Sequence, residues 1–136
     1  MIEGKTGQQI EDDVFSLFEK STLLSLINGK VYLFGMRPKN SGNEDAVVKF
    51  VTGLDGQIQT GVVVINIYVP NIEFNGVMVR NIERCAEIEK SANQWVKSLI
   101  PNEYLFSLAQ TIYTEEDPDI EQHFISIRLK YRLKTI

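Results

Sequence analysis

The side chains best suited to nucleophilic chemistry are Cys85 and His123, and the chain holds one residue of each type. Acyl transfer by a serine or cysteine needs an imidazole or an equivalent base that a third group orients. The sequence has no Gly-x-Ser-x-Gly turn, and Cys85 falls on the apolar side of a predicted helix. A small buried thiol is the commoner outcome at such a position, because no cationic neighbour is evident to activate it. We therefore expect neither a catalytic triad nor an enzyme.

A cluster of carboxylates between residues 115 and 121 is the next candidate. It holds Glu115, Glu116, Asp117, Asp119 and Glu121. The spacing is similar to part of a calcium-binding loop, but the glycine that makes the sharp turn of such a loop is missing. Exposed carboxylates also lack the burial that makes a general acid of Glu115 or Glu116. We favour a solvated, self-repelling hairpin tip, with a metal site or a charged contact surface as alternatives, and we expect no metal or cofactor.

A row of cations lies along the last predicted strand. Apolar residues alternate with polar ones over residues 124–133, so one face of this strand is predicted to be core. The other face carries the cationic row, which we define as Arg128, Lys130, Arg132 and Lys134. Four such positions span roughly 20 Å of like charge. Because like charges repel, the row calls for acidic neighbours in the sheet, an acidic surface of another subunit, or a phosphate backbone.

Two interpretations of this row stay open. In the plainer one, the cations protect an exposed strand face from aggregation. In the other, the row and the acidic segment 115–121 complement each other and meet head to tail between identical subunits. Heterologous contacts of this kind close into rings.

Composition places the chain among ordinary globular proteins. The 136 residues, 43% of them hydrophobic and 24% charged, fit a single domain over residues 1–136. The net charge of -4 argues against nucleic acid read by sequence as the main partner, and the single cysteine suits a reducing compartment. We expect no signal peptide and no membrane span, because the densest apolar run, residues 62–65, is far short of the ~20 residues that a span requires.

Apolar periodicity predicts an α+β fold of order α-β-β-β-α-β-β. About five strands, mostly joined as hairpins, predict a mostly antiparallel sheet with two helices packed on one face. Thr6 and Gln9 form a predicted capping box for the first helix, whose Glu11, Asp12 and Asp13 are expected on a solvated face. The predicted helices cover residues 7–20 and 79–99, the strands cover 31–34, 46–52, 62–69, 104–114 and 124–133, and residues 71–76 are assigned to a loop.

Residues 53–61 join the second and third predicted strands. The Asp-Gly dipeptide in this segment is typical of a tight turn, so the simplest structure is an antiparallel hairpin. We expect its arms to project past the body of the sheet.

Five short segments carry a family resemblance: GKVY at 29–32, RPK at 37–39, EDAVV at 44–48, GVVVINIYVP at 61–70 and RCAEIE at 84–89. Together with the N-terminal helix they resemble small prophage proteins of the tail-terminator or head–tail neck group. The similarity in element order covers nearly the whole chain, and none of the segments is a catalytic signature.

This resemblance implies a noncatalytic structural protein that forms a ring, with a hexamer as the expected size, on the end of a phage tail tube. Such a ring stops tube polymerisation and joins the tail to the head, so the implied partners are other copies of the chain, the tail tube and neck proteins. The implied location is the bacterial cytoplasm and then the virion, with no membrane contact.

Subunit contact in that family uses sheet edges and a long hairpin. The resemblance therefore implies that Leu54, Asp55 and Gln57 of the 53–61 hairpin touch a neighbouring subunit. The other expected contact residues are Arg128, Lys130 and Arg132 of the cationic row and Glu115, Glu116 and Asp117 of the acidic segment. The competing interpretation is a monomeric or dimeric protein-binding accessory module that uses the exposed sheet face.

Overall fold

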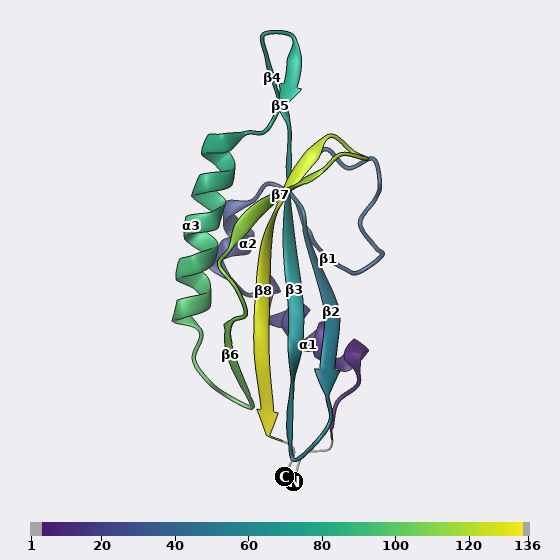
Figure 1. The fold of residues 1–136 in the computed structure, drawn as a ribbon, viewed down its shortest axis with the longest axis vertical. Helices are drawn as coiled ribbons and strands as arrows, with labels where there is room; N and C mark the ends of the chain where they lie inside the picture. The colour runs from purple at the N-terminus through teal and green to yellow at the C-terminus, as the bar shows by residue number, and fades with distance from the viewer. Residues whose placement is uncertain (1–3, 135–136) are drawn as a thin grey trace.

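A six-stranded sheet with helices packed against one face dominates the computed structural model, which describes residues 4–134 (Figure 1). The helices are α1 (Gly7–Glu19), α2 (Thr22–Leu26) and α3 (Ile82–Ser98). The strands are β1 (Val31–Leu33), β2 (Ala46–Leu54), β3 (Ile58–Pro70), β4 (Ile72–Phe74), β5 (Val77–Val79), β6 (Tyr104–Leu108), β7 (Tyr113–Asp117) and β8 (Gln122–Lys134).

The sheet has the strand order β1-β2-β3-β8-β6, and β7 pairs with β8 beyond β6. Strands β3 and β8 form the centre, since they pair over their full lengths from Ile58↔Lys134 to Pro70↔Gln122. All pairings are antiparallel except that of β1 with β2. The α+β class and the mostly antiparallel sheet are therefore as the sequence predicted.

The predicted number and order of elements are wrong in detail. The 104–114 strand is two strands, β6 and β7, which lie one after the other along β8 because residues 109–112 interrupt the pairing. A short helix, α2, follows α1. Residues 71–76, assigned to a loop, contain β4 and the turn of a separate two-stranded hairpin.

One apolar core lies between the sheet and the two long helices. The side chains of β8 that face the helices, at positions 125, 127, 129, 131 and 133, are fully buried. Phe18 of α1 meets Trp95 of α3 edge to face, with ring centroids 5.6 Å apart, so the two helices share this core. Both cover the same sheet face, as predicted, and the capping box of Thr6 and Gln9 is confirmed.

The predicted start of the long helix needs correction. It begins at Ile82 because Val77–Val79 belongs to β5, and Asn81 caps it by accepting a hydrogen bond from the Arg84 N–H at 3.2 Å. Ile82 is exposed, and the inner stripe consists of Cys85, Ile88, Ala92, Trp95 and Val96. Within residues 4–134 we find no helix with the length and apolar character to span a membrane.

The hairpin of residues 53–61 exists but does not project. Strand pairing continues to Leu54↔Thr60, so the turn itself is only residues 55–57. Its second arm stays in the sheet through the pairing of Ile58 with Lys134. The segment that leaves the body of the sheet is the β4–β5 hairpin, which extends at the opposite end of the long axis (Figure 1).

The β4–β5 hairpin turns at Asn75 and Gly76. Both have positive φ, 51° and 82°, as the tight two-residue turns of hairpins require. Asn-Gly is the strongest short-range hairpin signal in a sequence. Here it separates Phe74 from Val77, which pair across the hairpin.

Candidate interaction surfaces

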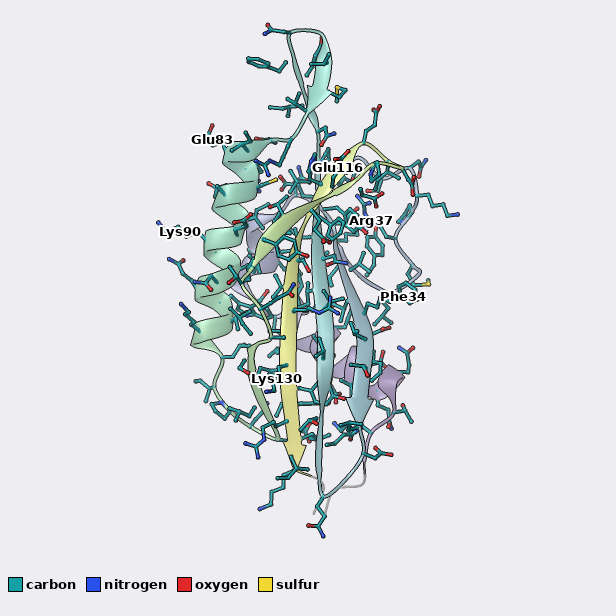
Figure 2. All side chains as sticks on the ribbon, viewed as in Figure 1. Phe34, Arg37, Glu83, Lys90, Glu116 and Lys130 are labelled. Atoms are coloured by element: carbon teal, nitrogen blue, oxygen red, sulfur yellow. The ribbon has the colours of Figure 1, made fainter. Side chains whose placement is uncertain are left out.

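The cationic row lies on the sheet face that carries no helix. Lys130, Arg132 and Lys134 are exposed, while Leu129, Tyr131 and Leu133 between them point into the core. This arrangement follows from the two-residue period of β8. Figure 2 shows Lys130 in the half of the sheet that lies away from the β4–β5 hairpin.

The strands beside the row offer it no acidic partner. Lys130 pairs with Val62 on β3 and with Ser107 on β6, while Arg132 pairs with Thr60 and Leu105. Within residues 4–134, none of the ion pairs includes a member of the row. The strand positions paired with Lys130 and Arg132 therefore supply neither of them with opposite charge.

Three of the five carboxylates of the acidic segment lie in a strand and not in a hairpin tip. Glu115, Glu116 and Asp117 belong to β7, and only residues 118–121 form the turn to β8. Strand alternation sends Glu115 and Asp117 to the open sheet face, whereas Glu116 lies opposite His123 on the other face. In the described part of the chain, no three carboxylate, imidazole or thiol groups gather closely enough to hold a metal.

Within residues 4–134, no hydrogen bond joins Cys85 to His123. Cys85 lies on the buried side of α3, and burial raises the pKa of its thiol, which disfavours the reactive thiolate. His123 Nδ1 lies 2.7 Å from Asn71 Oδ1, at the point where the chain leaves β3 for the β4–β5 hairpin. The contact of His123 attaches the base of that hairpin to β8.

A shallow groove lies at the end of the sheet away from the hairpin. We call it the basal groove, and its volume is about 440 Å³. Apolar atoms make up most of its exposed lining, and Ile58 and Leu105 are 47% and 45% exposed. Arg132 and Lys134 of the cationic row complete its margin together with Pro101, Asn102, Glu103 and Tyr104.

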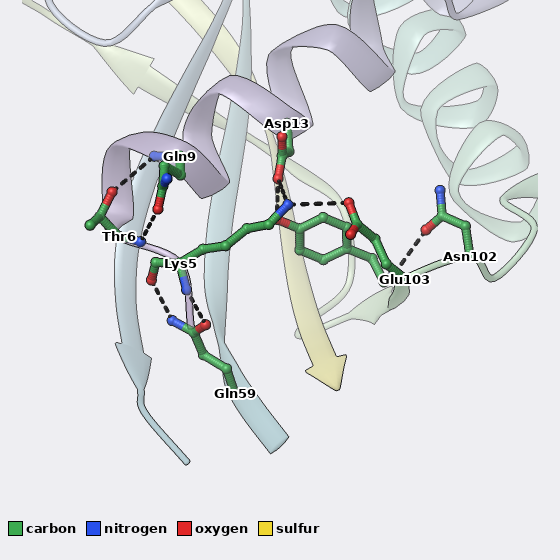
Figure 3. A network of polar contacts seen from close by, with 8 residues as sticks. Lys5, Thr6, Gln9, Asp13, Gln59, Asn102 and Glu103 are labelled. Carbon is green, nitrogen blue, oxygen red and sulfur yellow. Dashed lines mark hydrogen bonds and ion pairs between the residues drawn. The ribbon is translucent and has the colours of Figure 1, made fainter. Parts of the chain in front are cut away.

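A polar network holds one wall of the basal groove in place (Figure 3). The Tyr104 hydroxyl donates to Asp13 Oδ2 at 2.6 Å, and Lys5 Nζ lies 2.6 Å from the same oxygen and 3.2 Å from Glu103 Oε1. Burial, together with the hydrogen bond to Asp13, raises the pKa of Tyr104, so its hydroxyl stays protonated and acts as a donor. The network therefore ties β6 to α1, and its groups satisfy one another.

The β4–β5 hairpin presents an unusual amount of exposed apolar surface. Phe74 is 62% exposed, and Ile72, Val77 and Met78 of the same hairpin are also exposed. Ile82, at the start of α3, adds to this surface. Contiguous exposed apolar side chains of this kind mark protein contact sites, because water hydrates them poorly.

The body of the protein holds the hairpin firmly at its α3 end. Arg84 Nε and Nη2 donate to the two oxygens of Glu44, each at 2.7 Å, and Nη2 also donates to the Leu26 carbonyl at 2.7 Å. Arg84 lowers the pKa of the Glu44 carboxyl, so the pair stays ionised. Since Arg84 lies in the first turn of α3, this network fixes the point at which the hairpin returns to the fold.

The predicted contact residues of the 53–61 hairpin lie at the basal end of the sheet. Leu54 is 73% exposed, and residues 55–57 form the turn that follows it. Ile58, which lines the basal groove, begins the next strand. Leu54, Asp55 and Gln57 are thus near the groove in sequence, at the end opposite the acidic strand β7 (Figure 1).

Sequence reasoning missed both the hairpin surface and the basal groove. The Asn75-Gly76 dipeptide was a sufficient signal for the hairpin, since apolar residues lie on both sides of it. No comparable signal exists for the groove, because Ile58, Leu105 and Lys134 come from three strands that meet only in the folded sheet.

Comparison with known proteins adds no family assignment. No protein-family model matches the chain, and no curated protein matches it.

Proposed function

We propose that this protein is a noncatalytic structural subunit that binds copies of itself head to tail. The observation that carries the proposal is the separation of charge along the sheet. Glu115, Glu116 and Asp117 lie in β7, towards the end from which the hairpin extends, and the exposed members of the cationic row lie towards the other end. The acidic end of one copy is complementary to the basic end of the next.

The neutral neighbours of the row support this proposal. Four like charges in a row repel, and the flanking positions on β3 and β6 supply no carboxylate. A neighbouring subunit supplies the missing negative charge in a head-to-tail contact. Because such contacts are heterologous, repeating them produces a closed ring or an open filament.

The biological setting that we propose is the end of a phage tail. The resemblance described above implies a ring, hexameric in that group, that terminates the tail tube, joins it to the head and becomes part of the virion. In this setting Leu54, Asp55 and Gln57 belong to the basal contact surface, beside Arg128, Lys130 and Arg132. Tail tube and neck proteins are the further partners.

The decisive experiment measures particle mass across a concentration series by gel filtration with light scattering. We expect masses above that of the 15.5 kDa subunit, rising with concentration and falling at high salt, which screens exposed charges. Negative-stain images of concentrated samples should then show closed particles. A mass of one subunit at every concentration, with no particles in the images, would contradict the proposal.

A second candidate rests on the open sheet face. Among residues 4–134, no helix covers the face that carries the cationic row, so it is available to another protein. A monomeric or dimeric accessory module would use this face, and its measured mass would correspond to one or two copies. Binding of a short DNA duplex by a monomeric protein, with a steep dependence on salt, would instead assign the row to phosphate.

A further inference from the structure

The β4–β5 hairpin sorts its side chains onto two faces. Ile72, Phe74, Val77 and Val79 share one face, because Ile72 pairs with Val79 and Phe74 pairs with Val77. Glu73 and Met78 pair on the other face. The first face is thus wholly apolar, and its two residues nearest the turn, Phe74 and Val77, are among the most exposed apolar side chains of the hairpin.

A hairpin of two three-residue strands has little stability of its own. Its position depends on the body at both ends, through Asn71 beside His123 and through Asn81 at the start of α3. These contacts hold only the base of the hairpin. The apolar face nearer the turn packs on no other surface in the described chain. Docking of that face onto a partner would remove its apolar surface from water.

The basal groove has the complementary character. Ile58 and Leu105 expose apolar surface, and Pro101 adds an apolar wall. Arg132 and Lys134 at the margin make no ion pair within residues 4–134, while Glu103, also at the margin, already contacts Lys5. The charge left over at the groove is therefore positive.

The charge around the hairpin is mostly of the opposite sign. Glu73 lies in the hairpin and Glu83 follows it, and the turn of residues 118–121 carries Asp119 and Glu121 at the same end of the sheet. Arg80 is the one exposed cation of the segment 71–83. The hairpin end of the sheet is thus apolar with acidic surroundings. The end with the basal groove is apolar with cations that make no ion pair in the described chain.

The two surfaces cannot meet within a single chain, because the hairpin extends from one end of the sheet and the groove lies at the other (Figure 1). We infer that the apolar face of the β4–β5 hairpin docks in the basal groove of a second copy of this protein, with Phe74 and Val77 packed against Ile58 and Leu105. This inference rests on the proposed function, and it names the surfaces by which the copies join.

The docked hairpin makes each contact directional. One copy contributes the hairpin and the next contributes the groove, so the contact is heterologous and each subunit keeps one free hairpin and one free groove. The groove volume of about 440 Å³ lies within the range of pockets that hold small ligands, which suits a few inserted side chains.

Disulfide cross-linking tests the contact directly. Phe74→Cys and Leu105→Cys are made as separate variants, mixed, and oxidised with copper phenanthroline and dissolved oxygen. Cys85 stays in place, because it is buried. We expect a covalent dimer from the mixture and much less from either variant alone. The matched control is Phe34→Cys, an aromatic position of similar exposure, 58%, mixed with Leu105→Cys.

A second measurement separates this inference from the proposed function. Phe74→Asp should weaken self-association about tenfold or more by light scattering, as for a central contact residue, while Phe34→Asp should leave it unchanged. Assembly that persists in Phe74→Asp, or cross-linking through Cys at position 34 and not at position 74, would overturn the hairpin contact and leave head-to-tail assembly standing. Absence of any assembly in the unaltered protein would overturn both.

Discussion

The Tyr104 hydroxyl donates a 2.6 Å hydrogen bond to Asp13, and this bond joins the first residue of β6 to helix α1 across 91 positions of sequence. It also fixes one wall of the basal groove, because Tyr104 and its neighbour Leu105 line that groove. The stability of the fold and the shape of the proposed contact surface therefore depend on the same side chain.

Replacing Tyr104 by Phe should lower the free energy of unfolding by about 1.5 kcal/mol, because the variant loses a hydrogen bond to a charged group. Urea unfolding measures the loss. Tyr113→Phe is the control, since the Tyr113 hydroxyl makes a hydrogen bond of the same length to Glu115 at an exposed position. An equal effect of the two substitutions would show that burial of the Tyr104 hydrogen bond does not increase its contribution to the free energy of unfolding.

Gly53 makes room for the Tyr131 hydroxyl, which is buried and has no hydrogen-bond partner in the described chain. A Cβ at position 53 would lie 2.5 Å from Tyr131 Oη, so Gly53→Ala should destabilise the protein by about 2 kcal/mol. Tyr131→Phe should cost nothing, because it removes an unpaired polar atom. In the double variant we expect a recovery of about 1 kcal/mol, measured as a thermodynamic cycle by urea unfolding.

Gly61→Ala provides the contrast for that cycle. Its Cβ would lie 2.2 Å from the Thr52 carbonyl oxygen, a backbone atom that Tyr131→Phe does not move. We therefore expect Tyr131→Phe to leave most of the Gly61→Ala loss in place. Full recovery in this pair would mean that Tyr131 alone sets the space between β2 and β3.

The pair of Glu44 and Arg84 should make stability depend on pH. Arg84 holds the pKa of Glu44 below its ordinary value of 4.5, so the contribution of the pair is complete above pH 4.5 and is lost as the pH falls through the lowered pKa. Glu44→Gln should reduce the free energy of unfolding by about 3 kcal/mol at pH 7, because it leaves Arg84 without its main partner.

Urea unfolding between pH 7 and pH 3 checks this prediction. The difference between the unaltered protein and Glu44→Gln should shrink below pH 4.5. Glu87→Gln is the control, because Glu87 also contacts Arg84 but is largely exposed, and its effect should stay within about 0.5 kcal/mol. A constant difference across the pH range would contradict the assignment.

Reversal of charge in the cationic row should weaken assembly and leave the fold intact. Arg128→Glu with Lys130→Glu changes side chains on the open sheet face, away from the core. We expect a smaller particle mass by light scattering at equal concentration, with an unchanged circular dichroism spectrum. Lys90→Glu, on the exposed side of α3, should have no effect on mass (Figure 2).

The parts of the fold that the sequence predicts well are those with a long, regular period. Apolar and polar residues alternate along much of β8. The apolar ones form the buried face, because successive side chains of a strand point to opposite faces of the sheet. The β4–β5 hairpin was missed because its strands have three residues each, too few to establish a period, and because the predicted helix of residues 79–99 takes in Val79, which belongs to β5.

Burial of Glu11 illustrates what the sequence could not reveal. Its place in the first turns of α1 predicted a solvated side chain, yet it is 7% exposed. Glu11 Oε1 accepts a 2.9 Å hydrogen bond from the Phe50 N–H, where the β2–β3 register shifts. A partner 39 positions away, created by an irregularity in another strand, leaves no mark on the local pattern.

The central position of β8 also constrains how the protein is made. Its partner β3 is complete at residue 70, but β8 ends only at residue 134. During synthesis, β3 therefore lacks the neighbouring strand that buries it until all the intervening elements have been made. Long-range antiparallel pairing of this kind slows folding and leaves apolar strands open in the meantime. Nascent chains that stop before residue 122 should therefore depend on chaperones and be degraded readily.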